Sequence, residues 1–206
     1  ILKHLLPTCD AFQLGLLTEE GEDDRSRMHC DFFWCVDPLD GTLSFIESRA
    51  GYSVSIALVS RAGQALIGVV YDPLTQTLYS AISGQGAWRN RHGWSIDRND
   101  SFAGKPLTWI CDRGFESRAD FDRIQQALQT AAEQLGLSHI QISPSSGGAV
   151  MNACWVLEQQ PACYFKLPKV QTGGGSLWDF AATAALFQEL RAPVTDIHGA
   201  SLNLNR

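Results

Sequence analysis

The first candidate functional residues are two aspartates, Asp37 and Asp40, which lie three residues apart at the end of an apolar stretch. The stretch, residues 32–36, is typical of a buried strand. Pro38 keeps Asp37 extended and has no backbone N–H, so the chain turns sharply there. Both carboxylates can then point into one small volume, where they repel each other unless a cation lies between them. Oxygen ligands favour hard cations such as Mg²⁺, Mn²⁺ or Ca²⁺.

The next two residues, Gly41 and Thr42, extend this interpretation from a metal to an anion. Gly41 allows the backbone to approach a ligand closely, and the pair could open a short helix whose free N–H groups face an anion. A divalent metal beside such a site indicates phosphate ester chemistry. The alternative is an ordinary turn with solvated carboxylates, because Asp, Pro and Gly are common turn residues.

The string Asp-Pro-Leu-Asp-Gly-Thr over residues 37–42 resembles the metal-binding motif of the inositol monophosphatase superfamily. That family contains Mg²⁺-dependent, often lithium-sensitive phosphomonoesterases. Residues 45–46, 53–58, 68–73 and 79–81 are most similar to its 3'(2'),5'-bisphosphate nucleotidase branch. Trp178-Asp179, followed by two alanines, resembles the second family signature, whose aspartate completes the metal cage from the far half of the chain.

The resemblance implies a role for each matching residue. Glu19 corresponds to the first glutamate of a Glu-Glu pair that binds metal and helps to orient the attacking water. Thr42 would hydrogen-bond that water, and the phosphoryl group would pass in line to it without a phosphoenzyme. The implied catalytic residues are Glu19, Asp37 and Thr42; the implied substrate contacts are Asp40, Gly41, Thr42 and Asp179; and the implied metal ligands are Glu19, Asp37, the Leu39 carbonyl, Asp40 and Asp179.

By the same resemblance, the cofactor is Mg²⁺, as two or three ions, with Mn²⁺ as a substitute and Li⁺ as an inhibitor. The expected substrate is the 3'-phosphate of adenosine 3',5'-bisphosphate, and the alternative is an inositol monophosphate. Thr172, seven residues before Asp179, replaces a glutamate that contacts inositol hydroxyls in inositol monophosphatases. Lys166 and Lys169 could contact a second phosphate or lie on the surface. An alternative of another class is an inactive relative that binds a phosphorylated metabolite as a sensor or scaffold.

Composition limits the other possibilities. The 206 residues are 45% hydrophobic and carry a net charge of −6 without a basic tract, so the expected partner is a small phosphorylated metabolite and not a nucleic-acid polymer. No segment is long and apolar enough to predict a membrane partner, and a homodimer is left open. The six cysteines form no Cys-x-x-Cys pair, which is typical of reduced core residues in a cytoplasmic protein.

The pattern of elements predicts one compact α/β unit with two halves. Residues 1–104 are expected to form a metal-binding α+β half with an antiparallel sheet, and residues 105–206 an α/β half that completes the active site. The resemblance implies an α-β-α-β-α sandwich of the sugar phosphatase type. We also expect a helix over residues 1–6 that Pro7 stops, and a strand and turn within residues 194–205. Residues 145–148 are either an anion contact or an ordinary strand-to-helix connection, and residues 173–175 either a lid or a connector.

Overall fold

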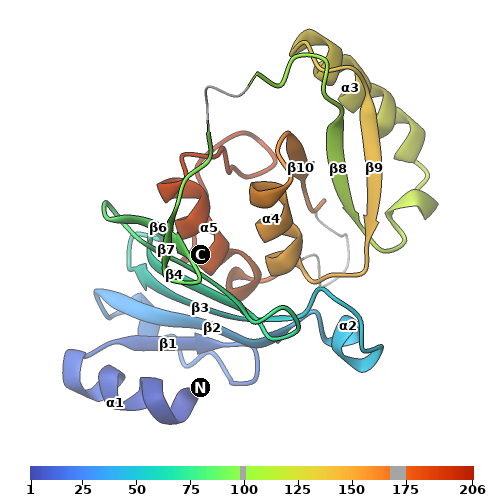
Figure 1. Ribbon diagram of the computed structural model, residues 1–206. Helices are drawn as coiled ribbons and strands as arrows, with labels where there is room; N and C mark the ends of the chain where they lie inside the picture. Colours follow the sequence, from blue (N-terminus) through green and yellow to red (C-terminus); the bar gives the residue numbers. More distant parts are fainter. Residues whose placement is uncertain (98–100, 168–174) are drawn as a thin grey trace.

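The computed structural model of the protein describes residues 1–97, 101–167 and 175–206 (Figure 1). Its elements lie in five layers, as the predicted α-β-α-β-α sandwich requires. Helix α1 (Leu2–Phe12) lies outside a seven-stranded sheet, and helices α4 (Ala149–Glu158) and α5 (Leu177–Glu189) lie inside it. A three-stranded sheet follows, with helix α3 (Phe121–Gln134) on its outer side. The predicted fold is therefore confirmed.

The seven-stranded sheet supplies the first half of the site. Strand β1 (Gly15–Thr18) pairs in parallel with β2 (Phe32–Asp40), and every later neighbour in the sheet is antiparallel. The hairpins expected over residues 51–82 are present, because their alternating residues can bury one face. The later strands are β3 (Ser53–Ser60), β4 (Ala65–Asp72), β5 (Thr77–Ile82), β6 (Gly86–Arg89) and β7 (His92–Trp94).

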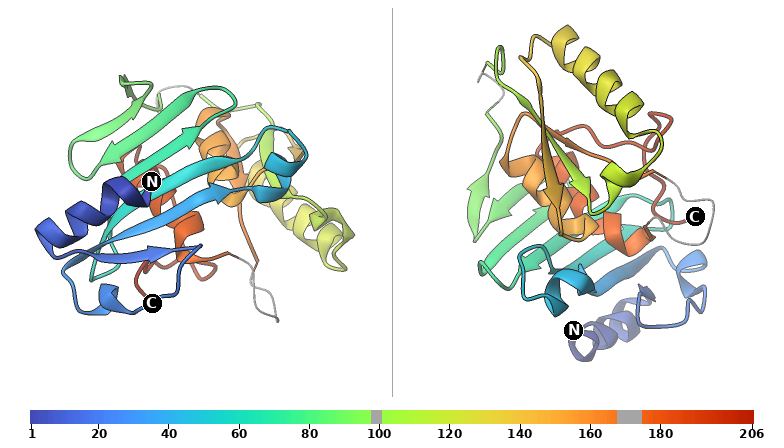
Figure 2. Two further views of the ribbon diagram at one scale, coloured as in Figure 1. Left: turned by 90° about the horizontal axis from the view of Figure 1, so that it is seen from below. Right: turned by 90° about the vertical axis from the view of Figure 1, so that its right-hand side faces the viewer.

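Helix α5 can approach this sheet closely because small residues line the contact. Residues 181–185 of α5 are alanines and one threonine, all buried. Opposite them, a Cβ added to Gly68 of β4 would lie 2.2 Å from the Ala182 carbonyl oxygen. Figure 2 shows α5 against one face of the sheet and α1 against the other. Close packing thus brings the first turn of α5 to the end of β2.

The second sheet has the order β10-β8-β9, and all of its pairings are parallel. Because parallel strands run the same way, the carboxyl ends of all three meet at one edge, and this edge faces the start of α4. Three further short helices complete the described elements. The strands are β8 (Leu107–Asp112), β9 (Ile140–Ser145) and β10 (Ala162–Tyr164), and the short helices are α2 (Thr42–Ile46), η1 (Ser26–Met28) and η2 (Phe115–Ser117).

Two sequence predictions are wrong. Pro7 does not stop the first helix, which continues to Phe12. The Thr8 hydroxyl donates to the Leu5 carbonyl and accepts a hydrogen bond from the Trp34 indole N–H at 2.8 Å, which ties this turn to β2. Residues 194–205 form no strand, because the Asp196 carboxylate accepts the N–H groups of His198 and Ala200 and folds the segment into a turn.

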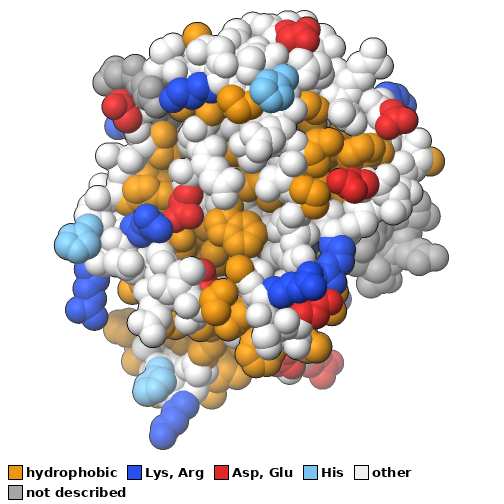
Figure 3. Space-filling model, turned by 45° about the vertical axis from the view of Figure 1, so that its right-hand side comes forward, with side chains coloured by type: hydrophobic (Ala, Val, Ile, Leu, Met, Phe, Trp, Pro, Cys, Tyr) orange, Lys and Arg blue, Asp and Glu red, His pale blue; other side chains and the backbone are white. Residues whose placement is uncertain are grey.

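Two observations concern the described helices and one face of the surface. Within the described residues, no helix is both long and apolar enough to cross a membrane. On the face shown in Figure 3, acidic and basic side chains lie interspersed, and the basic ones do not gather in one stretch.

Candidate active site

A β-bulge places Asp37 and Asp40 on the same face of β2. In a regular strand, residues three apart point to opposite faces. Here Asp37 pairs with Ser55 and Asp40 pairs with Ser53, and the register shifts between them. Ser53 and Ser55 are two residues apart and share a face, so their partners do as well. Both aspartates therefore face α5.

Asp179 reaches the same place from the first turn of α5. Its Oδ2 atom accepts the Ser176 backbone N–H at 2.8 Å, which caps the helix. The Ser55 hydroxyl of β3 donates to the Trp178 carbonyl at 3.2 Å and fixes this turn against the sheet. Asp37, Asp40 and Asp179 each offer a carboxylate oxygen, and these oxygens lie within 4.8 Å of one another. Two distant signatures of the sequence thus meet in one cluster.

Burial and mutual repulsion make this cluster costly without a cation. Burial raises the pKa of Asp37 to about 8, and the charges of Asp40 and Glu19 add to the rise. Burial also raises the pKa of Asp40 to about 7, with a further contribution from the charge of Asp179. Only 1% of Asp37 and 7% of Asp40 is exposed to solvent. A group of converging, buried carboxylate oxygens fits a hard divalent cation, which would remove the repulsion.

The remaining predicted residues lie beside the cluster. Glu19 follows β1 directly and is exposed, and its charge contributes to the raised pKa of Asp37. Gly41 has a left-handed backbone (φ 80°) and immediately precedes α2 as its N-cap. The Thr42 hydroxyl is exposed and donates to the Leu39 carbonyl at 3.2 Å. Glu19 thus lies at the end of the strand beside β2, and Gly41 and Thr42 directly follow Asp40.

The start of α4 contacts Asp40 directly, which the sequence did not predict. The Val150 N–H donates to Asp40 Oδ2 at 3.0 Å, and the Ala149 N–H also stabilises the ionised form. A Cβ added to Gly148 would lie 2.1 Å from the same oxygen. The Ser44 hydroxyl of α2 donates to the Ser146 carbonyl, so the loop after β9 packs against the loop after β2. The turn over residues 145–148 therefore joins β9 to α4 and also positions the start of α4 against Asp40.

Lys166 lies at the edge of the cluster. Its Nζ atom is 4.0 Å from Asp179 Oδ2, and the Lys166 side chain is 23% exposed. Thr172, Lys169, Gly173 and Gly174 lie outside the described residues. A ligand bound at the aspartates would therefore lie near the positive charge of Lys166.

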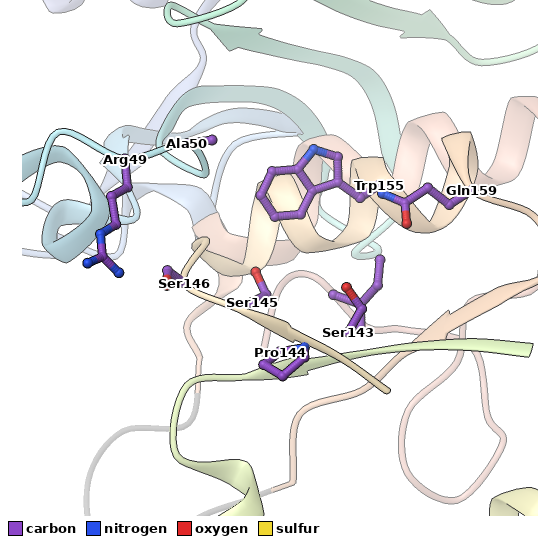
Figure 4. Close-up of a pocket in the computed structure, with 9 residues that line it drawn as sticks. Arg49, Ala50, Ser143, Pro144, Ser145, Ser146, Trp155 and Gln159 are labelled. Atoms are coloured by element: carbon purple, nitrogen blue, oxygen red, sulfur yellow. The ribbon is translucent and has the colours of Figure 1, made fainter. Parts of the chain in front are cut away.

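A pocket of about 270 Å³ lies beside the turn that opens α4 (Figure 4). Arg49 and Ala50 border it on one side, and Trp155 of α4 and Gln159, which follows α4, border it on another. Asp112 and Asn152, close to this turn, were also missed by the sequence interpretation. The available signal was Asn152 itself, which is a polar residue inside the apolar run of α4.

The fold and the site together define an α/β protein in which strand β2 and helix α5 meet at a cluster of carboxylates suited to a divalent metal. The sequence profile of the inositol monophosphatase family matches residues 9–206, and the chain belongs to that family. It is 33% identical over 177 residues to the 3'(2'),5'-bisphosphate nucleotidase CysQ of Escherichia coli K12, covering 86% of this chain and 64% of that protein. It is 29% identical over 186 residues to the Nus factor SuhB of Pasteurella multocida, covering 87% and 60%.

A solved structure confirms the fold. The chain matches inositol monophosphatase-II of Staphylococcus aureus with a TM-score of 0.77 at 23% identity, covering 98% of this chain and 69% of that one. At this identity the match shows the fold alone. The chain spans just under two thirds of the length of the E. coli relative.

Proposed function

We propose that the protein is a metal-dependent phosphomonoesterase whose active site is the cluster of Asp37, Asp40 and Asp179. The observation that carries the proposal is the convergence of three carboxylates, from two elements far apart in the chain, within 4.8 Å. Membership of the inositol monophosphatase family supports the same activity. The cation expected is Mg²⁺, replaceable by Mn²⁺, with Li⁺ as an inhibitor.

The proposed metal ligands are the three aspartates together with Glu19 and the Leu39 carbonyl. A divalent cation bound there would lower the pKa of a water molecule and offset the charge of a phosphate. Without such a cation, four carboxylates would repel a phosphate group, so the site can accept its substrate only when it is loaded.

The other residues would act on the water and the phosphate. Glu19, which is exposed and next to Asp37, would accept the proton of the attacking water. The Thr42 hydroxyl would turn from the Leu39 carbonyl to hold that water. The amides of Gly41 and Thr42 would hold phosphate oxygens, since Gly41 has no side chain to block the approach.

For the substrate, we propose a nucleotide with two phosphates, such as adenosine 3',5'-bisphosphate. Lys166 supports this choice, because it adds a positive charge 4.0 Å from Asp179 where a second phosphate could bind. The relative from E. coli, itself named a 3'(2'),5'-bisphosphate nucleotidase, supports it as well. The competing substrate is inositol 1-phosphate, which offers only hydroxyls at that position.

The test is phosphate release from both substrates, with Mg²⁺ and with EDTA, by the full-length wild-type protein and by Lys166→Gln. We expect Mg²⁺-dependent release with a higher kcat/KM for the bisphosphate. In Lys166→Gln, that preference should fall by roughly 10-fold, the scale of one charged hydrogen bond. A higher kcat/KM for inositol 1-phosphate would overturn the substrate choice. Absence of release from either substrate, together with tight binding of one, would favour a sensor or scaffold.

A further inference from the structure

Asn152 is the centre of a buried hydrogen-bond network at the carboxyl edge of the second sheet. The residue has no exposed surface. Its Oδ1 atom accepts the Ser145 hydroxyl, and its Nδ2 atom donates to Asp112 Oδ1 at 3.1 Å. The Tyr164 hydroxyl donates to the same Asp112 oxygen at 2.9 Å. One amide thus joins the ends of β8, β9 and β10 to helix α4.

This network holds both sides of the turn over residues 145–148. Ser145 Oγ accepts the Gly147 N–H at 2.9 Å, and Asn152 Nδ2 lies 3.4 Å from the Gly147 carbonyl oxygen. The Asn152 backbone N–H donates to the Gly148 carbonyl at 3.1 Å. A Cβ added to Gly147 would lie 2.9 Å from Asn152 Oδ1, so the turn packs directly on the amide. The position of the turn therefore depends on Asn152.

The turn over residues 145–148 also determines the orientation of the Asp40 carboxylate. The Gly148 N–H donates to the Gly51 carbonyl at 2.8 Å, and this carbonyl lies beside Gly41. The following N–H of Val150 holds Asp40 Oδ2 at 3.0 Å. Because one oxygen of Asp40 is held in this way, the orientation of its carboxylate beside Asp37 and Asp179 is restrained. A shift of the turn would rotate or release this carboxylate.

Packing alone does not hold the turn in place. The pocket of about 270 Å³ borders Ser145 and Ser146 on the side near Arg49, as Figure 4 shows. Side chains therefore do not fill the space on that side of the turn. A segment with open space beside it can move unless directional bonds restrain it, and the network supplies such bonds.

We propose that Asn152 is a positioning residue for the metal site: with Asp112 and Tyr164, it holds the turn over residues 145–148 so that Asp40 is presented to the divalent cation. The proposal rests on the proposed function. Groups that orient metal ligands without touching the metal change metal affinity by about 10- to 100-fold when they are removed.

The test compares Asn152→Leu with Leu157→Ala in the full-length protein. Leucine has the same branched side chain of four heavy atoms as asparagine, but that side chain makes no hydrogen bonds. Leu157 is buried in the same helix and packs in the main core, away from the turn, so its truncation is a matched control for lost stability. Tyr164→Phe removes a single hydroxyl of the network and serves as a milder variant should Asn152→Leu not fold.

Two quantities are measured. The first is the dissociation constant for Mg²⁺ by titration calorimetry, and the second is the hydrogen exchange of the Ala149 and Val150 amides in EDTA. We expect Asn152→Leu to raise the dissociation constant about 10- to 100-fold and to speed exchange at both amides. Tyr164→Phe should move both in the same direction by less, and Leu157→Ala should leave both unchanged.

An unchanged dissociation constant in Asn152→Leu, or an equal rise in Leu157→Ala, would overturn the proposal. If the wild type binds no Mg²⁺, the proposed function fails, while the exchange rates in EDTA still decide whether Asn152 holds the turn. If the exchange rates of the Ala149 and Val150 amides are the same in Asn152→Leu and the wild type, the network does not position these amides. This conclusion holds for any value of the Mg²⁺ dissociation constant.

Discussion

Replacing Asp40 by asparagine should stabilise the metal-free protein, although it removes a predicted metal ligand. The pKa of Asp40 is about 7 in the fold and 3.8 ordinarily, because the carboxyl is buried beside Asp179. A carboxyl with a raised pKa favours the folded state at low pH, and that contribution is lost as the pH rises through the folded pKa. Above pH 7, therefore, the ionised Asp40 works against folding. Asparagine removes this charge and keeps an oxygen to accept the Val150 N–H.

The magnitude follows from the change in pKa. A rise from 3.8 to about 7, at about 1.4 kcal/mol per pKa unit, corresponds to ~4 kcal/mol of unfolding free energy at pH 8.5. For a chain of this length, 1 kcal/mol shifts the melting temperature by about 2–4 °C, so Asp40→Asn should melt roughly 10 °C higher in EDTA. Near pH 4, where the wild-type carboxyl is largely protonated when folded, the two proteins should melt together.

Thermal denaturation from pH 4 to 8.5 in EDTA measures this directly. In Mg²⁺ at 100 times its dissociation constant the difference should shrink to roughly 1 kcal/mol, since the cation then stabilises the wild type by ~2.7 kcal/mol and the variant binds it poorly. Ser53→Ala, on the strand opposite Asp40, is a control that leaves the charges intact. An Asp40→Asn variant that melts below the wild type at pH 8.5 in EDTA would refute the electrostatic reasoning.

Three further predictions concern the same site. Thr42→Ala should lower kcat by about 10²-fold with little change in KM, because it loses the group that holds the water; a change confined to KM, seen in steady-state kinetics, would instead assign Thr42 to phosphate binding. Gly148→Ala should weaken Mg²⁺ binding in calorimetry, because its Cβ would collide with Asp40 Oδ2; Gly93→Ala, where the added Cβ meets nothing within 4 Å, is the control. The affinity for Mg²⁺ should rise from pH 6 to 9 as Asp37 and Asp40, with pKa values of about 8 and 7, lose their protons, and a constant affinity would contradict those values.

The part of the site that could be predicted from the sequence is the part encoded in short segments. Asp37, Asp40 and Asp179 lie in compact motifs, and the structure brings all three together. The sequence suggested a turn that directs Asp37 and Asp40 to one side, and the structure shows the physical cause, which is a bulge opposite Ser53 and Ser55. The bulge arises from the pairing of β2 with β3, and the spacing of two aspartates carries no information about that pairing.

The residues that were missed act through contacts between distant segments. Asn152 contacts Asp112, forty positions earlier, and Asp112 also accepts the Tyr164 hydroxyl. No periodicity predicts such a meeting, because it depends on how α4 lies over the end of the second sheet. Pro7 shows the same limit, since the helix continues through it where Thr8 is held by Trp34. The division of the chain at residue 104 stays a prediction.

The most direct test of the central claim is the anomalous diffraction of crystals of the protein grown with Mn²⁺ at pH 8.5. The account predicts an anomalous peak in contact with carboxylate oxygens of Asp37, Asp40 and Asp179, at about 2.0–2.2 Å as for a small hard cation. Crystals of Asp179→Asn should show the peak weakened or lost. Full occupancy of Mn²⁺ elsewhere on the molecule, with the three aspartates free of it, would contradict the account.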